Sequence, residues 1–143
     1  MILAVLFAAA APVVGVLEFR DKVPAEQRID AAYLSDQVRA AVKEVLPQSR
    51  VITRENMLIL LQASGRDLQE CEGECEVDTG RRIGADHIVS GEIQKVGTRY
   101  KLTLRLHDTH EGRLLASSIG SGKSIDELDE SAQKAAEELF TVH

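Results

Sequence analysis

The chain of 143 residues is long enough for one domain with a sizeable core and short for two. Hydrophobic residues make up 44% and charged residues 28%, which are ordinary globular values and argue against wholesale disorder. The formal net charge of -6, without any Lys/Arg run, argues against a nucleic-acid partner, because binding a phosphate backbone requires clustered positive charge.

The first 17 residues, MILAVLFAAAAPVVGVL, carry no charge. We interpret residues 1–11 as a signal peptide, because the apolar run ends in small residues of the kind that signal peptidase cleaves after. Two alternatives stay open: an N-terminal apolar anchor of nearly membrane-spanning length, or a terminal strand or helix of the fold. The domain is expected to cover residues 12–143.

The first half of the chain predicts two strands, each followed by a helix. Val13 to Phe19 is rich in β-branched residues and predicts a strand, and residues 20–28 predict a charged connecting loop. Apolar residues recur with a helical period from Ile29 to Leu46. A short strand is expected at residues 50–53, and a helix from Arg54 to Ser64 that is buried on most of its sides. This order predicts a βαβ crossover with a parallel strand pair.

The second half predicts a short helix, three consecutive antiparallel strands and a closing helix. The short helix covers Glu76 to Ile83, and the strands cover Asp86 to Val96, Tyr100 to His107 and Leu114 to Ile119. The closing helix begins with the capping box Ser124-x-x-Glu127. The expected fold class is therefore α/β (α+β): a single mixed sheet with helices packed on it, in the order β-α-β-α-(short α)-β-β-β-α.

The middle strand of this meander alternates strictly between apolar and polar residues, which is typical of a half-buried strand. Its apolar side chains are expected to bury the core. On the other face we expect Lys101, Thr103 and Arg105 to meet solvent or a partner.

Both cysteines lie in an irregular stretch, as Cys71-x-x-x-Cys75. Two cysteines cannot complete a structural zinc site, which requires four ligands. A thioredoxin-like motif has two intervening residues rather than three, and the neighbouring glutamates would raise the thiol pKa. In an exported protein the pattern predicts a local disulfide between Cys71 and Cys75 that pins a surface loop.

The segment Gly120 to Ser124, sequence GSGKS, is similar to the end of a P-loop. The full motif requires glycine where this chain has Ser117, and too few residues follow for a strand that would hold Mg²⁺. We interpret the segment as a flexible turn that leads into a capped helix. The amides of Gly122, Lys123 and Ser124 form a candidate weak anion site.

The segment His107-Asp108-Thr109-His110-Glu111 offers metal-ligating side chains but no evident distant ligand, so a solvated turn is the preferred interpretation. No spacing of carboxylates, or of serine or cysteine with histidine, indicates a shared catalytic site. The sequence thus predicts no catalytic, cofactor-binding or metal-binding residues.

Three motifs carry a family resemblance: V-x-V-L-E-F from Val14, V-I-T-R-E-N-M-L-x-L-L from Val51, and I-G-A-D-x-I-V-S-G-E-I-x-K-V-G from Ile83. With the closing helix they resemble the TolB amino-terminal-domain-like superfamily, which includes periplasmic domains of the curli secretion protein CsgG and the penicillin-binding-protein activator LpoB. The resemblance covers Val13 to Phe140.

The resemblance implies a non-enzymatic, exported module of a Gram-negative-type cell envelope that binds envelope proteins or assembles with copies of itself. It implies no cofactor, no nucleic acid and no substrate. The chain lacks the lipobox cysteine and the long insertions of the secretion channel, so a channel function is not expected. The alternative is a nucleotide- or anion-binding regulatory domain that uses the turn from Gly120 to Ser124.

Overall fold

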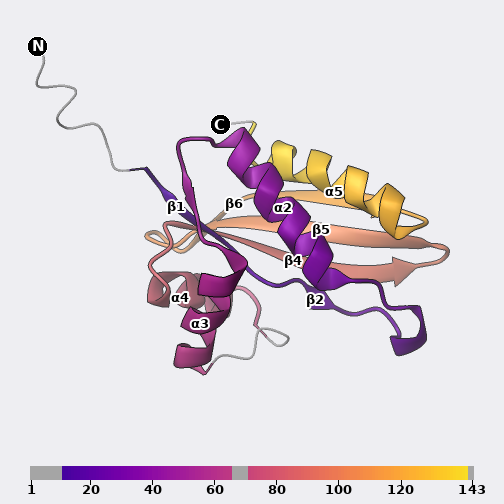
Figure 1. The fold of residues 1–143 in the computed structure, drawn as a ribbon, viewed down its shortest axis with the longest axis horizontal. Helices are drawn as coiled ribbons and strands as arrows, with labels where there is room; N and C mark the ends of the chain where they lie inside the picture. Colours follow the sequence, from indigo (N-terminus) through magenta and orange to yellow (C-terminus); the bar gives the residue numbers. More distant parts are fainter. Residues whose placement is uncertain (1–10, 66–70, 142–143) are drawn as a thin grey trace, which may run out of the picture.

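The computed structural model describes residues 11–65 and 71–141, which form one six-stranded mixed sheet with helices on both faces (Figure 1). The strands are β1 (Val13–Val16), β2 (Arg20–Asp21), β3 (Arg50–Val51), β4 (His87–Val96), β5 (Arg99–Asp108) and β6 (Arg113–Gly122). The helices are the 3₁₀ turn η1 (Ala25–Gln27), α2 (Ala31–Val45), α3 (Arg54–Ser64), α4 (Glu74–Arg82) and α5 (Ile125–Leu139). The expected fold class and element order are confirmed.

The sheet has the order β3-β1-β4-β5-β6, with β2 also paired to β4. β1 runs parallel to both β3 and β4, as the βαβ pattern predicts, whereas β4, β5 and β6 form the expected antiparallel meander. Residues 1–10, which hold most of the expected signal peptide or anchor, lie outside the described residues. Among the described helices, none is long and apolar enough to cross a membrane.

The prediction that residues 20–28 form only a loop is wrong at its start. Arg20 and Asp21 form β2, which pairs in parallel with Glu92 and Ile93 of β4. The chain can continue along β4 because Phe19 packs over Gly91, where any Cβ would lie 2.5 Å from the phenyl ring. Gly91 thus permits the close approach expected there.

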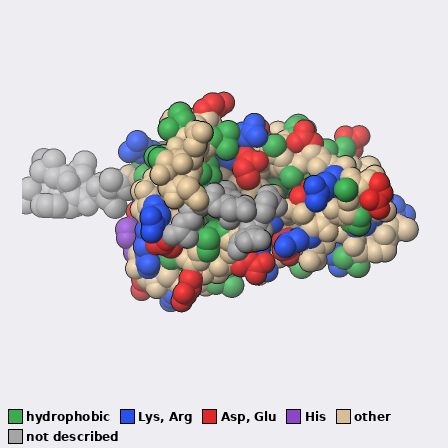
Figure 2. All heavy atoms as spheres, turned by 90° about the horizontal axis from the view of Figure 1, so that it is seen from below, with side chains coloured by type: hydrophobic (Ala, Val, Ile, Leu, Met, Phe, Trp, Pro, Cys, Tyr) green, Lys and Arg blue, Asp and Glu red, His purple; other side chains and the backbone are tan. Residues whose placement is uncertain are grey.

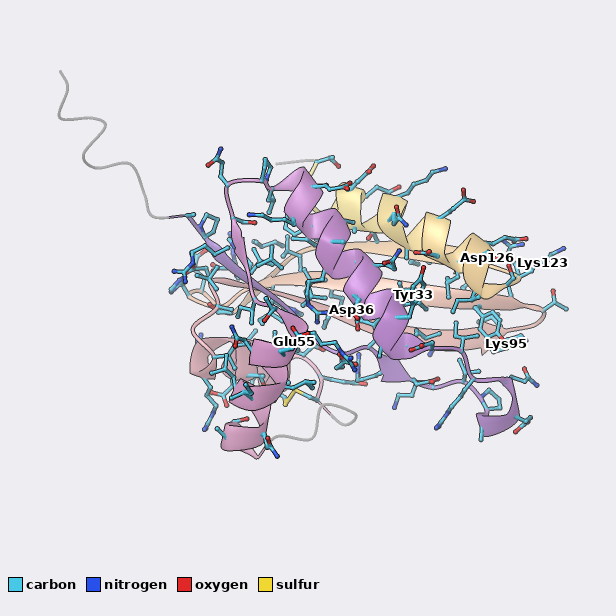
Figure 3. All side chains as sticks on the ribbon, viewed as in Figure 1. Tyr33, Asp36, Glu55, Lys95, Lys123 and Asp126 are labelled. Carbon is cyan, nitrogen blue, oxygen red and sulfur yellow. A yellow bond between two sulfur atoms is a disulfide. The ribbon has the colours of Figure 1, made fainter. Side chains whose placement is uncertain are left out.

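One face of the sheet, which we call the covered face, packs against α2 and α5 and holds the main core (Figure 1). Both helices have capped starts: the Asp30 side chain accepts from the amide of Tyr33, and the Ser124 side chain from that of Glu127. Tyr33 lies on the side of α2 that faces α5 (Figure 3). Its hydroxyl donates to Asp129 of α5 at 2.9 Å, which raises the Tyr33 pKa and ties the two helices together. The strands contribute fully buried side chains to this core: Val14, Val16, Val89, Ile93, Leu102 and Leu104.

The opposite face is only partly covered, by α3 and α4, over a second and smaller core. The prediction that α3 is buried on most sides is wrong. Met57 and Leu61 are buried, but Leu58, Ile59 and Leu60 are 43%, 63% and 37% exposed. The helix lies beside the short strands β1 and β3 near one edge of the sheet, so only one stripe of its surface meets the sheet.

Candidate interaction surface

The polar residues of β5 lie on the face opposite the main core. Lys101 is exposed, and Thr103 and Arg105 are half-buried, so the three expected partner-facing residues share one face. The register places one residue of β6 beside each, in the pairs Lys101–Ser121, Thr103–Ile119 and Arg105–Ser117. We call these six residues the open strip.

The open strip combines charge with exposed apolar surface. Ile119, at its centre, is 61% exposed, and Leu114 at the start of β6 is 53% exposed. Large apolar side chains beside hydroxyl, lysine and arginine groups supply both apolar contact and hydrogen bonds, as protein-binding surfaces do. On the side of the molecule that Figure 2 shows, by contrast, acidic and basic side chains are interspersed, and neither positive nor negative charge gathers in one area.

β6 is also the outer strand of the sheet, so within the described residues no further strand pairs with its free side. Alternate residues of an edge strand direct their N–H and C=O groups away from the neighbouring strand. Ser121 belongs to this outward set, because its amide donates to Ser131 Oγ of α5 at 2.8 Å. Ile119 and Ser117 follow at intervals of two residues and share that orientation.

A buried polar cluster lies on the same face, between β2, α4, β4 and β5. Arg20, Glu76, Ser90 and His107 are all less than 9% exposed. The guanidinium of Arg20 lies 3.9 Å from Glu76 and 3.7 Å from the half-buried Glu92. This pairing explains how an arginine and a glutamate can be buried, since each charge has an opposite charge nearby.

The order of contacts in the cluster differs from that of a catalytic relay. In such a relay, histidine lies between the hydroxyl and the carboxylate and takes the hydroxyl proton. Here Ser90 Oγ donates directly to Glu76 Oε2, and His107 Nδ1 lies 3.5 Å from that same oxygen. Burial lowers the pKa of His107, against the opposing effect of the Glu76 carboxylate. The Glu76 carboxylate thus accepts from Ser90 and lies near the Arg20 charge, and His107 is not placed between the hydroxyl and the carboxylate.

The expected disulfide between Cys71 and Cys75 is present, with the two Cα atoms 5.2 Å apart. Cys71 is buried, and Glu72 within the ring pairs with the buried Arg20. In the chain-entropy model so small a ring stabilises the fold by about 2 kcal/mol. The ring therefore does more than pin a surface loop, since it also places the exposed carboxylate of Glu72 beside the buried Arg20.

The ring borders a cavity of about 370 Å³ beside the open strip. Arginine and glutamate side chains line it, together with Gly73, His107 and Leu114. The charge of Arg20 at this cavity is already met by the surrounding carboxylates. The cavity thus connects the buried cluster to Arg105 of the open strip.

The segment Gly120 to Ser124 is not the flexible turn predicted from its composition. Gly120 to Gly122 belong to β6, and Gly122 lies against α5, where a Cβ would come within 2.5 Å of the amide nitrogen of Leu128. The glycines allow the sheet and helix to approach closely. At the helix start the amide of Lys123 donates to Glu127 Oε1 at 3.0 Å, so a carboxylate occupies one expected anion-binding position. Anion binding by Gly122, Lys123 and Ser124 stays a prediction.

The segment from His107 to Glu111 divides between the interior and the surface. His107 is buried, so its interpretation as part of a solvated turn is wrong, while His110 is exposed and contacts Asp86 Oδ1 at 2.7 Å. The other carboxylate oxygen of Asp86 accepts from the amide of Val13 at 2.8 Å. Among the described residues, no group of three or more His, Cys, Asp or Glu side chains could hold a metal ion.

Sequence reasoning missed the buried cluster because its members are far apart in the chain and each one resembles a surface residue. Arg20 belongs to a charged segment, and Glu76 is one of several glutamates around the cysteines. The only available signal was the alternation of β5, which places His107 on the same face as Arg105.

Comparisons with solved structures support the fold. The C-terminal domain of LpoB from Salmonella enterica superimposes with a TM-score of 0.65 at 14% identity, over 82% of this chain and 87% of that one. Lipoprotein GNA1162 from Neisseria meningitidis gives 0.63 at 14% identity, over 79% and 81%. The PelC dodecamer from Paraburkholderia phytofirmans gives 0.53 at 14% identity, over 92% and 86%.

The similarity to LpoB confirms the fold that the resemblance implies. No curated protein matches the chain. A family model matches residues 21–141, from β2 through α5, and thus almost all of the described domain. The chain belongs to the family described as "Protein of unknown function (DUF2380)".

Proposed function

We propose that the protein is a non-enzymatic interaction module of the cell envelope and that the open strip is its contact surface. The observation that carries this proposal is the exposure of Ile119, 61%, between the hydroxyl and cationic side chains of β5 and β6. The covered face buries its apolar residues under two helices, whereas the strip exposes an isoleucine without such a helix. A protein partner would bury it.

Three observations support the envelope as the location. The disulfide is typical of proteins that fold in an oxidising compartment. Residues 1–11 have the pattern of a signal peptide or apolar anchor. Among proteins with the same fold, GNA1162 is described as a lipoprotein. The PelC dodecamer suggests self-assembly as a second form of the same interaction function.

A photo-crosslinking experiment in cells of the native host tests the proposal. A photoreactive amino acid replaces Thr103 or Ile119 in the open strip, or Gln133 on the exposed side of α5 as the control. We expect adducts from the two strip positions and none from the control. The substitutions Lys101→Glu and Arg105→Glu together should remove the adducts without changing the melting temperature.

Equal adducts from the strip and from Gln133 would contradict the proposal. Adducts that survive both charge reversals would show that Lys101 and Arg105 do not take part in binding. Fractionation of the same cells tests the location, since a protein recovered only with the cytoplasm would contradict an envelope function.

A further inference from the structure

The free edge of β6 carries neither the charges nor the proline that commonly prevent strands from pairing with an edge, and its one irregularity in register, at Leu115, lies near its start. The nine residues from Leu114 to Gly122, LLASSIGSG, contain no charged residue and no proline. Edge strands usually carry lysine, proline or other interruptions, because their unpaired backbone groups otherwise template the addition of a strand. β6 is ten residues long and forms the outer edge of the described sheet. Its composition therefore favours a partner strand.

The backbone of β6 offers a short section for such pairing. The outward amide of Ser121 is already bonded to Ser131 Oγ, which closes the edge near the start of α5. Ile119 and Ser117 lie farther along and direct their N–H and C=O groups outward in the same way. An added strand can therefore form ladder hydrogen bonds around these two residues.

The side chains of the open strip indicate which residues that strand would carry. Lys101 and Arg105 lie one strand inward, and each is directly opposite a serine of β6. An added strand would lie about 10 Å from β5, since neighbouring strands are about 4.8 Å apart. The small serines leave room for the lysine and arginine side chains to extend across β6 toward its edge. Between them Ile119 presents an apolar side chain.

We propose that β6 binds an extended segment of the partner protein as an added strand with the pattern acidic-x-apolar-x-acidic. The apolar residue would pack beside Ile119, and the two acidic residues would pair with Lys101 and Arg105. Backbone pairing supplies affinity in this mode of recognition, and the alternate side chains supply specificity. This inference rests on the proposed function, because it assumes that the open strip is the contact surface.

Synthetic peptides test the pattern on the purified protein. The probe is a nine-residue fluorescent peptide with the core Glu-Thr-Ile-Thr-Glu, and the control replaces both glutamates with glutamine. A third peptide keeps the acidic core but carries N-methyl groups on backbone amides that would donate to β6. We expect the glutamine control and the N-methylated peptide each to bind about tenfold more weakly than the probe, as measured by fluorescence anisotropy. Added salt should weaken binding of the probe more than binding of the glutamine control.

Protein variants separate the backbone contribution from the charge contribution. Ser117→Pro removes an outward N–H donor but no hydrogen bond to β5, so it should weaken binding of the probe. Ser118→Thr, on the covered side, should leave binding of the probe unchanged. Lys101→Glu with Arg105→Glu should abolish the preference for the acidic peptide. If Ser117→Pro unfolds the protein, the N-methylated peptide still tests the backbone pairing on the unaltered protein.

Two outcomes would overturn the inference: equal binding of the probe and its N-methylated form, or no binding of the probe at millimolar concentration. Either outcome leaves the proposed function standing if Thr103 and Ile119 still cross-link to a partner in cells. Loss of those adducts in the native host would instead contradict the proposed function itself. Concentration-dependent self-association that Ser117→Pro removes would show that a second copy occupies the edge, which also overturns the inference.

Discussion

The two faces of the sheet use the same strands in different ways. On the covered face, the apolar residues of β4, β5 and β6 form one continuous core beneath α2 and α5. On the opposite face, α3 and α4 cover a separate small core, a charged cluster is buried beside it, and the open strip meets solvent. One face thus buries most of the apolar side chains, while the other leaves a strip of strand surface exposed. Binding functions are expected on the second.

The largest predicted effect on stability comes from truncating a buried side chain on the covered face. Leu104 is fully buried in the middle of β5, whereas its neighbour Thr103 belongs to the open strip. Leu104→Ala should lower the free energy of unfolding by about 3 kcal/mol, because it removes buried methyl groups and leaves a cavity. Thr103→Ala should change it by no more than about 0.5 kcal/mol. Urea denaturation followed by circular dichroism measures both.

Similar losses for Leu104→Ala and Thr103→Ala would show that the open strip is as important for stability as the main core. The separation of the two faces into a stabilising side and a binding side would then be wrong. Partner cross-linking from Ile119 should survive Thr103→Ala.

A smaller effect tests how α5 closes over the covered face. A methyl group on Gly122 would lie 2.5 Å from the backbone nitrogen of Leu128, so the strand and helix would have to move apart. Gly122→Ala should therefore destabilise the protein by about 1–3 kcal/mol. Ser121→Ala is the matched control on the other face and should have little effect. If the segment from Gly120 to Ser124 were a flexible turn, it would tolerate both substitutions. Equal melting temperatures for Gly122→Ala and Ser121→Ala would therefore support a flexible turn.

The covered face could be predicted from the sequence because its signals are periodic and local. The alternation of β5 and the helical spacing in α2 and α5 identify the residues that must be buried, and the capping box locates the start of α5. Even there, the glycines of β6 were misinterpreted. A glycine gives the same signal whether it permits a turn or the close approach of a helix, and only tertiary packing distinguishes the two.

The opposite face was harder to predict because its structure depends on contacts between distant segments. The composition of α3 indicates an apolar helix, but how many of its sides are covered depends on the width of the sheet beneath it. Likewise, burial of Arg20 depends on Glu72, Glu76 and Glu92, which are more than 50 residues away in the chain. Strand alternation is a local property, and it places Lys101, Thr103 and Arg105 on the face opposite the main core, as in the structure. Their contact with a partner stays a prediction.

The smallest predicted effect concerns two histidines near this face, whose stability contributions should depend on pH in opposite directions. The bond to Asp86 raises the pKa of His110 above its ordinary value of 6.5, and the amide of Val13, followed by His110, lowers the pKa of Asp86 below 3.8. The stabilisation from His110 is therefore fully present below pH 6.5 and is lost as the pH rises through its raised pKa. That from Asp86 is lost only as the pH falls below 3.8.

His110→Ala should accordingly lower the melting temperature more at about pH 5.5 than at about pH 8.5. His107 is the comparison, because burial lowers its pKa, so the unfolded chain takes up the proton at a higher pH than the folded chain does. His107→Gln removes that linkage, so its melting temperature relative to the unaltered protein should rise as the pH falls from about 7.5 to about 5.5. If the melting temperatures of the two variants, relative to the unaltered protein, change in the same direction with pH, His107 and His110 do not occupy different environments. The buried cluster would then be as open to solvent as the strip beside it.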